Sequence, residues 1–265
     1  MEKKFESNTF GKRLKSMLIV DCRRLTTSPF FYIMVGIAFV IPVLILVMTT
    51  MMGGSAPTGE NNVAAMESFE NVWQIIGSVG GAGMGMNMGL TGMCNINMMY
   101  FAVAIWLCIF IADDFRSGYA KNLFTVRAKK TDYVISKTTV GFIGAVAIFL
   151  AFFIGALLGG GIAKLPFEME GFNVGNVVSC ILSKMGLSLV FVAVCVLASV
   201  VGKQRAWLSV LLAFGFGMLF FTMIPMVTPL DSTAVHVAVC FAAGALFSIG
   251  LGYISNLVLK KTSLV

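Results

Sequence analysis

Charged residues are scarce in this chain of 265 residues, and six long stretches lack them altogether. Asp, Glu, Lys and Arg make up 12% of the sequence, whereas 58% of its residues are hydrophobic and the mean hydropathy is +0.92. A soluble domain of this size needs more polar surface than that. The stretches without charge are residues 30–52, 93–112, 138–163, 185–202, 206–230 and 232–259.

Each of these stretches can cross a lipid bilayer. Roughly 20 helical residues, rising about 1.5 Å each, span a hydrocarbon core of about 30 Å. The stretches are continuously apolar, which excludes the alternating strands of a membrane barrel. We therefore predict an all-α integral membrane protein. Its six transmembrane helices lie in a domain of residues 30–265, and residues 1–29 precede them.

Motifs for catalysis and metal binding are also missing. The chain has no GxxxxGK[ST] phosphate-binding loop, no HExxH, no GxSxG and no CxxC pair. Its single histidine, His236, suits an interfacial hydrogen-bonding role better than catalysis. The predicted spans contain no acidic residue, which disfavours coupling to protons or sodium through side chains. We expect no enzyme, no metal site and no cofactor bound to this chain.

The basic residues predict the orientation in the membrane. If the N-terminus is cytoplasmic, 17 of the 19 Lys and Arg residues lie on the cytoplasmic side, together with the C-terminus. The other side then holds only Lys164 and Lys184, and we expect Lys184 to extend from the start of the fourth span to the outer surface. The net charge of +7 is thereby explained by topology, and no basic face is left for nucleic acid.

Residues 1–29 predict an amphipathic helix that lies in the inner headgroup layer and contacts lipid. A basic flank with chance periodicity is the alternative. The sequence TTSP, residues 26–29, would then turn the chain into the first span. The residues that carry the helix prediction are Phe10, Leu14, Leu18, Arg23 and Arg24, with Met17 and Leu25 on the same apolar stripe.

Glycine, methionine and proline mark special places. The outer loop, residues 53–92, leads into a Gly- and Met-rich segment, residues 77–99, which suits a linker, a surface turn or a re-entrant piece that touches a hydrophobic substrate. Gly155 and Gly159 form a small-xxx-small pair for close helix packing. Pro42 and Pro225 are expected to kink the first and fifth spans.

The connector between the second and third spans, residues 113–137, is both charged and amphipathic. Phe115, Tyr119, Leu123 and Val126 recur on one helical face, with polar residues elsewhere. This pattern predicts a short surface helix. Asp113 and Asp114 are expected to cap its start, and Thr131 to cap the third span. A loop that is basic only because it is cytoplasmic is the alternative.

This connector resembles that of ABC-2-type transporter permeases. The matching pattern is Asp114-x3-Gly118, the apolar pair Leu123 and Phe124, a basic turn at residues 129–130, and Tyr133-x3-Lys137. The segment VDCRRLTTSPFF resembles the entry helix of that family. The chain departs from the family in having Asp where Glu is common, and in lacking Pro at residues 126–128.

The resemblance implies a permease of the bacterial cell membrane that forms a homodimer or heterodimer and docks two ATP-binding subunits. ATP and magnesium would bind to those partners, and the connector would be a coupling helix. The implied coupling residues are Asp113, Asp114, Phe115, Arg116, Gly118, Tyr119, Lys121 and Leu123, with Lys137 anchoring the third span. Charge reversal at Asp114 or Lys121 should then uncouple the ATPase while the bundle still inserts.

The expected substrate is amphipathic or hydrophobic, such as an antimicrobial peptide or a lipid-like compound, because the spans are bare of charge and rich in aromatic residues. Two other functions remain open from sequence. One is a channel or secondary carrier that needs no ATPase. The other is a membrane immunity or scaffold protein that binds a peptide without transporting it.

Overall fold

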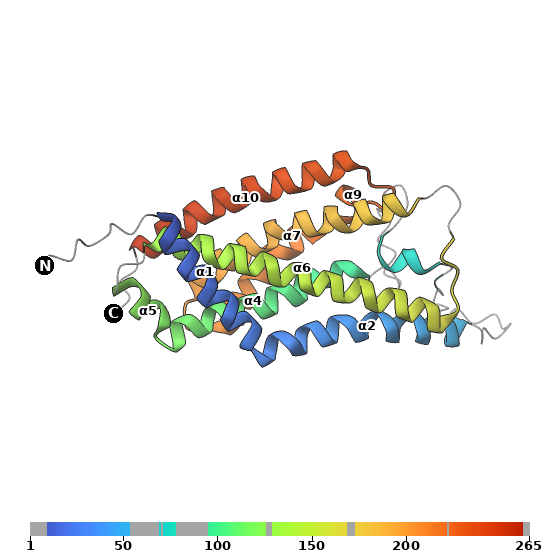
Figure 1. Ribbon diagram of the computed structural model, residues 1–265, viewed down its shortest axis with the longest axis horizontal. Coiled ribbons are helices and arrows are strands. Elements are labelled where there is room, and N and C mark those ends of the chain that lie inside the picture. The colour runs from blue at the N-terminus through green and yellow to red at the C-terminus, as the bar shows by residue number, and fades with distance from the viewer. Residues whose placement is uncertain are drawn as a thin grey trace, which may run out of the picture.

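The computed structural model describes residues 10–53, 69, 71–77, 95–125, 129–168, 173–221 and 223–261, and these form helices and no strand. Figure 1 shows their arrangement. The helices are α1 (Phe10–Thr27), α2 (Pro29–Gly53), η1 (Val72–Ile75), η3 (Ile96–Met98), α4 (Met99–Arg116), α5 (Tyr119–Thr125), α6 (Lys130–Ala163), α7 (Val174–Gly202), α8 (Ala206–Phe221), α9 (Ile224–Val227) and α10 (Ala234–Lys261).

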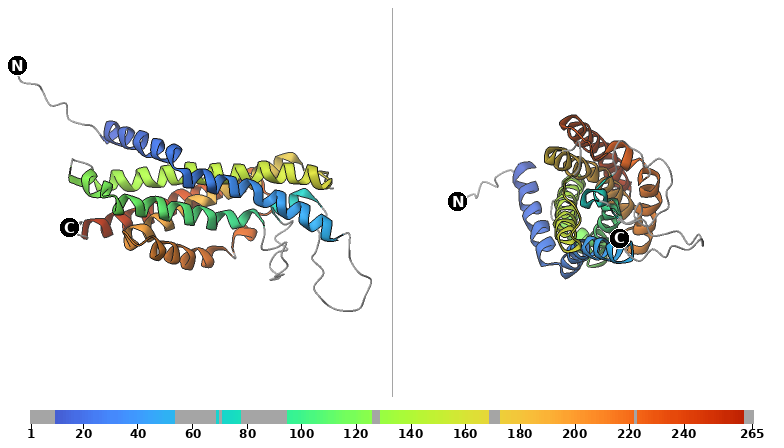
Figure 2. Two further views of the ribbon diagram at one scale, coloured as in Figure 1. Left: turned by 90° about the horizontal axis from the view of Figure 1, so that it is seen from below. Right: turned by 90° about the vertical axis from the view of Figure 1, so that its right-hand side faces the viewer.

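The long helices run side by side, and α1 lies across one end of their bundle (Figures 1 and 2). We call this the α5 end, because α5, the start of α6 and the end of α10 are all found there; the opposite end, where η1 lies, is the η1 end. The turn between α1 and α2 forms as predicted, with Pro29 as the first residue of α2. Proline suits that position because the first turn of a helix needs no backbone N–H.

Five helices are long and apolar enough to cross a membrane: Pro29–Met51, Ile96–Arg116, Lys130–Ala163, Val174–Gly202 and Ala234–Lys261. The fifth predicted span is instead divided into α8, of 16 residues, and α9, of four. Pro225 stands in the first turn of α9, where its missing N–H is tolerated. It therefore begins a new helix rather than kinking a continuous one, and the bundle has five to six apolar helices able to span a membrane.

Helix α6 is longer than its predicted span. It has 34 residues, about 51 Å of helix, and its first eight residues precede the uncharged stretch that starts at residue 138. The N-cap position is Lys129, without a side-chain cap bond, so Thr131 is not the cap that the sequence suggested. These extra turns hold polar side chains at the α5 end.

The glycine pair of α6 packs closely on α2, as predicted. A Cβ atom at Gly155 would lie 2.2 Å from the carbonyl oxygen of Phe39 and 2.8 Å from Pro42. At Gly159 it would lie 2.8 Å from the Cα of Val43. Lipid offers no hydrophobic drive between helices, so such close backbone packing is what holds them together.

Segments at the η1 end tie the helices to one another. Asn71 donates its side-chain Nδ2–H to the carbonyl of Glu168 at 2.7 Å, and the Trp73 indole donates to the carbonyl of Phe167 at 2.7 Å. The predicted Gly- and Met-rich segment is described only at residue 77 and at 95–99, where η3 leads into α4. Its remaining part lies outside the described residues.

We expect Gly155→Ala to weaken the bundle, because the new methyl group meets the α2 backbone rather than a flexible side chain. Overpacking of this kind costs about 1–3 kcal/mol of folding free energy. Thermal unfolding of the purified protein in mild detergent measures the change. Gly161→Ala in the same helix is the matched control, since a Cβ there meets nothing within 4 Å. Equal midpoints for the two variants would contradict the packing argument.

Candidate functional site

Four charged side chains meet inside the α5 end of the bundle and form what we call the buried ion cluster: Asp21 and Arg24 of α1, Asp114 of α4, and Lys137 of α6. The Lys137 Nζ lies 2.8 Å from Asp21 Oδ1 and 2.7 Å from Asp114 Oδ2. Arg24 pairs with the other oxygen of Asp114 and lies 3.9 Å from Asp21 Oδ1. Two acids thus balance two bases.

Three of the four members of the cluster are closed to water, whereas the Arg24 side chain is 29% exposed. Asp21, Asp114 and Lys137 are all 0% exposed. Removing such charges from water is costly unless each finds a partner and further hydrogen bonds. Those bonds are present: Ser136 Oγ donates to Asp21 Oδ2 at 2.7 Å, and the Tyr133 hydroxyl donates to Asp114 Oδ2 at 2.9 Å.

Aromatic rings surround the two cations. The Arg24 guanidinium lies 4.5 Å from the ring centre of Tyr119 in α5, and the Lys137 ammonium lies 4.7 Å from that of Phe110. Burial of its ring, helped by the nearby carboxylates of Asp21 and Asp114, raises the pKa of Tyr119 to about 12. Its phenol therefore stays neutral at physiological pH, and its ring faces the cation as an uncharged aromatic surface.

Helix α1 packs on α6 through one face, in which Met17, Asp21 and Leu25 are buried. A second ion pair, from Arg13 Nε to Asp132 Oδ2 at 3.1 Å, joins the same two helices. Of the residues predicted for a lipid-facing helix, Phe10 and Arg23 are exposed, Leu14 and Leu18 are half-buried, and Arg24 points into the ion cluster.

Sequence reasoning missed Asp21. The available signal was its position within the stripe Met17-x3-Asp21-x3-Leu25, one acid at helical spacing between two apolar residues. An acid placed there demands a buried cation, and Lys137, 116 residues away in the sequence, supplies it.

Some residues of the connector are buried in the bundle, and others are exposed. Asp114 and Phe115 are buried in the last turn of α4, so neither begins a new helix; Asp113 belongs to α4 as well and is exposed. Gly118, with φ of 75°, makes the break between α4 and α5, a conformation that suits glycine. Val126 lies outside the described residues.

Helix α5 presents its apolar residues to the bundle. Ala120 is buried, Leu123 packs against the core, and the Phe124 ring lies 5.4 Å from that of Tyr133. Lys121 is exposed on the other side, as is Arg116 just before the break. The predicted apolar face is therefore used within this chain, and the polar face is the one that is open.

The burial of Asp114 changes what its charge reversal should do. A lysine or arginine there would stand beside Arg24 and Lys137, in a place without access to water. The expectation that a charge-reversed bundle still inserts normally therefore applies to Lys121 alone.

Lys184 was predicted to extend to the outer surface, but the structure places it inside the bundle. It is 0% exposed, and its Nζ lies 2.9 Å from Asn97 Oδ1 and 2.9 Å from Thr228 Oγ1. The prediction was wrong because α7 begins at Val174, so Lys184 lies ten residues inside the helix and bonds to polar side chains of other segments.

Metal binding finds no support in the part of the chain that the structure describes. It holds no group of three or more His, Cys, Asp or Glu residues that could ligate an ion. The only carboxylates of the ion cluster are already engaged by Lys137, Arg24, Ser136 and Tyr133. The cluster thus joins α1, α4 and α6 through contacts between their charged side chains.

Lys137→Met should destabilise the bundle strongly, since the buried carboxylates of Asp21 and Asp114 then keep only the partly exposed Arg24 between them. Removing one member of a buried ion pair costs about 3–5 kcal/mol. Thermal unfolding in detergent and the yield of monodisperse protein report the loss.

A second substitution tests the cause. Adding Asp21→Asn to Lys137→Met restores neutrality and should recover part of the stability, whereas Lys129→Met, at an exposed lysine, should change it by less than about 0.5 kcal/mol. If the double variant is no more stable than Lys137→Met, charge balance is not what the cluster provides.

Comparison with known proteins gives the family. A family model described as ABC-2 family transporter protein matches residues 18–220, well over half of the chain. No curated protein and no solved structure matches this chain. The match includes the ion cluster and the connector, and it ends within α8. The chain therefore belongs to the ABC-2 family of transporter proteins, as a multi-pass permease subunit of an ABC transporter rather than an enzyme.

Proposed function

We propose that this permease works in an ATP-driven exporter, and that α5 is the helix through which the ATP-binding subunit acts on it. The observation that carries the proposal is the two-sided character of α5. Its apolar side is fixed to α4 and α6, while Lys121 on its other side, with Arg116 and Asp113 close by in sequence, is exposed at the α5 end.

Mechanical continuity supports this role. The Tyr119 ring at the start of α5 faces Arg24, and the ion cluster then links α1, α4 and α6. A partner that displaced α5 would therefore act, through Tyr119, on the closely paired charges of the ion cluster. Separating those charges inside the protein is costly, so the three helices would move together.

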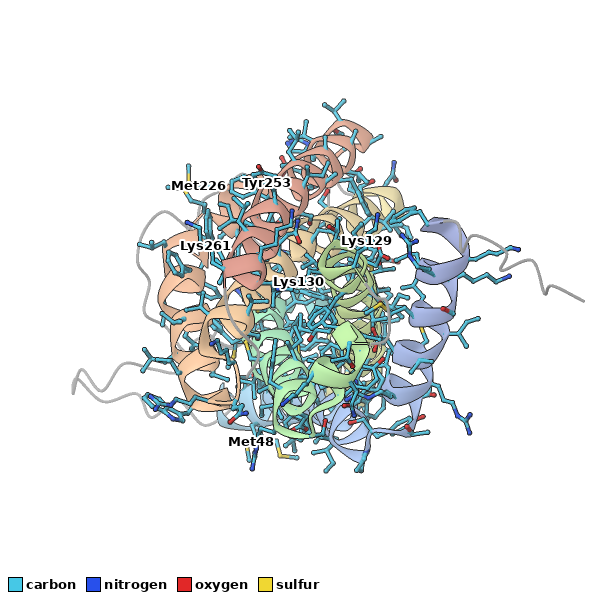
Figure 3. All side chains as sticks on the ribbon, turned by 90° about the vertical axis from the view of Figure 1, so that its left-hand side faces the viewer. Met48, Lys129, Lys130, Met226, Tyr253 and Lys261 are labelled. Atoms are coloured by element: carbon cyan, nitrogen blue, oxygen red, sulfur yellow. The ribbon has the colours of Figure 1, made fainter. Side chains whose placement is uncertain are left out.

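The charge distribution supports a cytoplasmic α5 end. Lys129, Lys130 and Lys261 lie at this end, which Figure 3 views end-on, and Lys130 Nζ donates to the carbonyl of Leu259 at 2.6 Å. Basic residues concentrate on the cytoplasmic side of membrane proteins. We place both termini there, in a bacterial cell membrane, with two permease chains and two ATP-binding subunits in the transporter.

An amphipathic or hydrophobic substrate, such as an antimicrobial peptide or a lipid-like compound, fits the apolar spans best. Ionisable side chains inside a membrane are the usual route for small ions. The buried acids of the described residues, Asp21, Asp114 and Asp132, all lie at the α5 end, where each is paired with a basic side chain. A route for an apolar molecule needs no such groups.

Lys121→Glu should weaken the complex with the ATP-binding subunit without disturbing the bundle, because Lys121 is exposed. We expect about ten-fold weaker association, or ~1.4 kcal/mol, and a matching loss of substrate-stimulated ATP hydrolysis. Co-purification in mild detergent and ATPase assays in liposomes measure both.

Lys164→Glu is the matched control, since it reverses an exposed lysine at the other end of α6. Equal behaviour of the two variants would refute docking at α5. Transport by the permease alone in liposomes would indicate a channel or secondary carrier. Substrate binding without transport or stimulation of ATP hydrolysis would indicate a scaffold or immunity protein.

A further inference from the structure

Within the part of the chain that the structure describes, Lys137 and Lys184 are fully buried, and their surroundings differ in one respect. Lys137 lies between two carboxylates at 2.8 and 2.7 Å. Lys184 has two neutral oxygens, from the Asn97 amide and the Thr228 hydroxyl, each at 2.9 Å. No Asp or Glu within the described ranges forms an ion pair with Lys184.

The charge of a Lys184 ammonium is therefore not neutralised within the described part of the bundle. Two hydrogen bonds to neutral oxygens satisfy donors, but they do not compensate a positive charge taken out of water. The same chain neutralises its other buried lysine completely, so the imbalance at Lys184 is a property of this site. An anionic group next to it would gain a strong, charge-assisted interaction in a medium of low dielectric constant.

The site lies well inside the bundle. Lys184 is ten residues beyond Val174, the first residue of α7, which is about 15 Å along the helix axis. The Tyr100 hydroxyl donates to the backbone carbonyl of Lys184 at 2.9 Å and fixes this turn of α7 against α4. The lysine is thus held at a set depth instead of reaching a surface.

The two partners of Lys184 are held differently. Asn97 belongs to η3, which runs directly into the long helix α4, whereas Thr228 follows α9, of four residues. A helix as short as α9 has few backbone hydrogen bonds of its own to hold it in place. It can separate from α7 at a smaller cost than a long helix can, and that separation would open a path to the ammonium.

We propose that Lys184 binds the anionic group, a carboxylate or phosphate, of the amphipathic molecule that this permease transports. This inference rests on the proposed function, because it concerns the substrate of the same transporter. In this structure the oxygens of Asn97 and Thr228 accept hydrogen bonds from the Lys184 ammonium. When α9 separates from α7, the anionic group takes the place of the Thr228 hydroxyl while the apolar part of the molecule stays among the spans.

Binding of simple amphiphiles to the full-length permease in nanodiscs of zwitterionic lipid tests the proposal. Dodecyl phosphate and dodecanoate carry the two anionic groups, and dodecyltrimethylammonium carries the same chain with a cation. We expect one or both anions to bind the wild-type protein about ten-fold more tightly than the cation, and about ten-fold more tightly than they bind Lys184→Met. Isothermal titration calorimetry gives the affinities.

The controls separate charge from folding. Lys184→Met should fold, because it removes an unpaired buried charge, and Lys184→Gln, which can still donate a hydrogen bond, serves if it does not. Lys164→Met, at an exposed lysine, should bind like the wild type. Equal anion affinity in the wild type and in the folded Lys184 variant would overturn the proposal.

Inorganic phosphate tests whether the anion must belong to an amphiphile. Binding of free phosphate as tight as that of dodecyl phosphate would overturn that part of the proposal. The assay contains no ATP-binding subunit, so its failure leaves docking at α5 intact. Conversely, a failure of docking would leave the affinities measured here unchanged.

Discussion

The ammonium of Lys137, enclosed between the carboxylates of Asp21 and Asp114, is the interaction on which the α5 end of this protein depends. It forces α1, α4 and α6 to meet at one point, because no member of the set can leave without exposing an uncompensated charge to an apolar interior. The position of α5 follows from it, since Tyr119 packs on Arg24 of the same cluster. In the proposed coupling, this is why a short helix can move a whole bundle.

Much of the fold could be predicted because lipid imposes a simple rule. A helix that crosses the bilayer must be long and apolar, so the uncharged stretches marked α2, α4, α6, α7 and α10. The fifth stretch departs from the prediction because Pro225 lies in the first turn of a separate helix, α9, where a kink in one continuous span was expected. Gly155 and Gly159 indicated a close helix contact but not that α2 is the partner, and the close approach of Gly186 and Gly244 between α7 and α10 was not singled out.

The candidate site was harder to predict, since its contacts join residues far apart in the sequence. The connector motif drew attention to Asp114 and Lys137, yet what they contact is each other and Asp21. Lys184 shows the same limit. A lysine at the edge of an uncharged stretch ordinarily reaches water, whereas here α7 begins ten residues earlier and Asn97 and Thr228 bind the ammonium inside the bundle. Periodicity shows which face of a helix is apolar, but it does not show which polar residue of another helix pairs with a buried charge.

Helix α6 joins the two ends of the molecule. It contains no proline and runs unbroken from Lys130 to Ala163, so its beginning and its end behave as parts of one stiff element. Its first turns hold Tyr133, Ser136 and Lys137 in the ion cluster, and its last turns receive α2 at Gly159 and Val72 of η1 at Gly160. In the proposed coupling, a displacement imposed on the cluster at Lys137 is carried about 39 Å along the rest of α6 to the η1 end. The proposed action of an ATP-binding subunit at α5 thus has a continuous path of close contacts by which to reach the far end of the bundle.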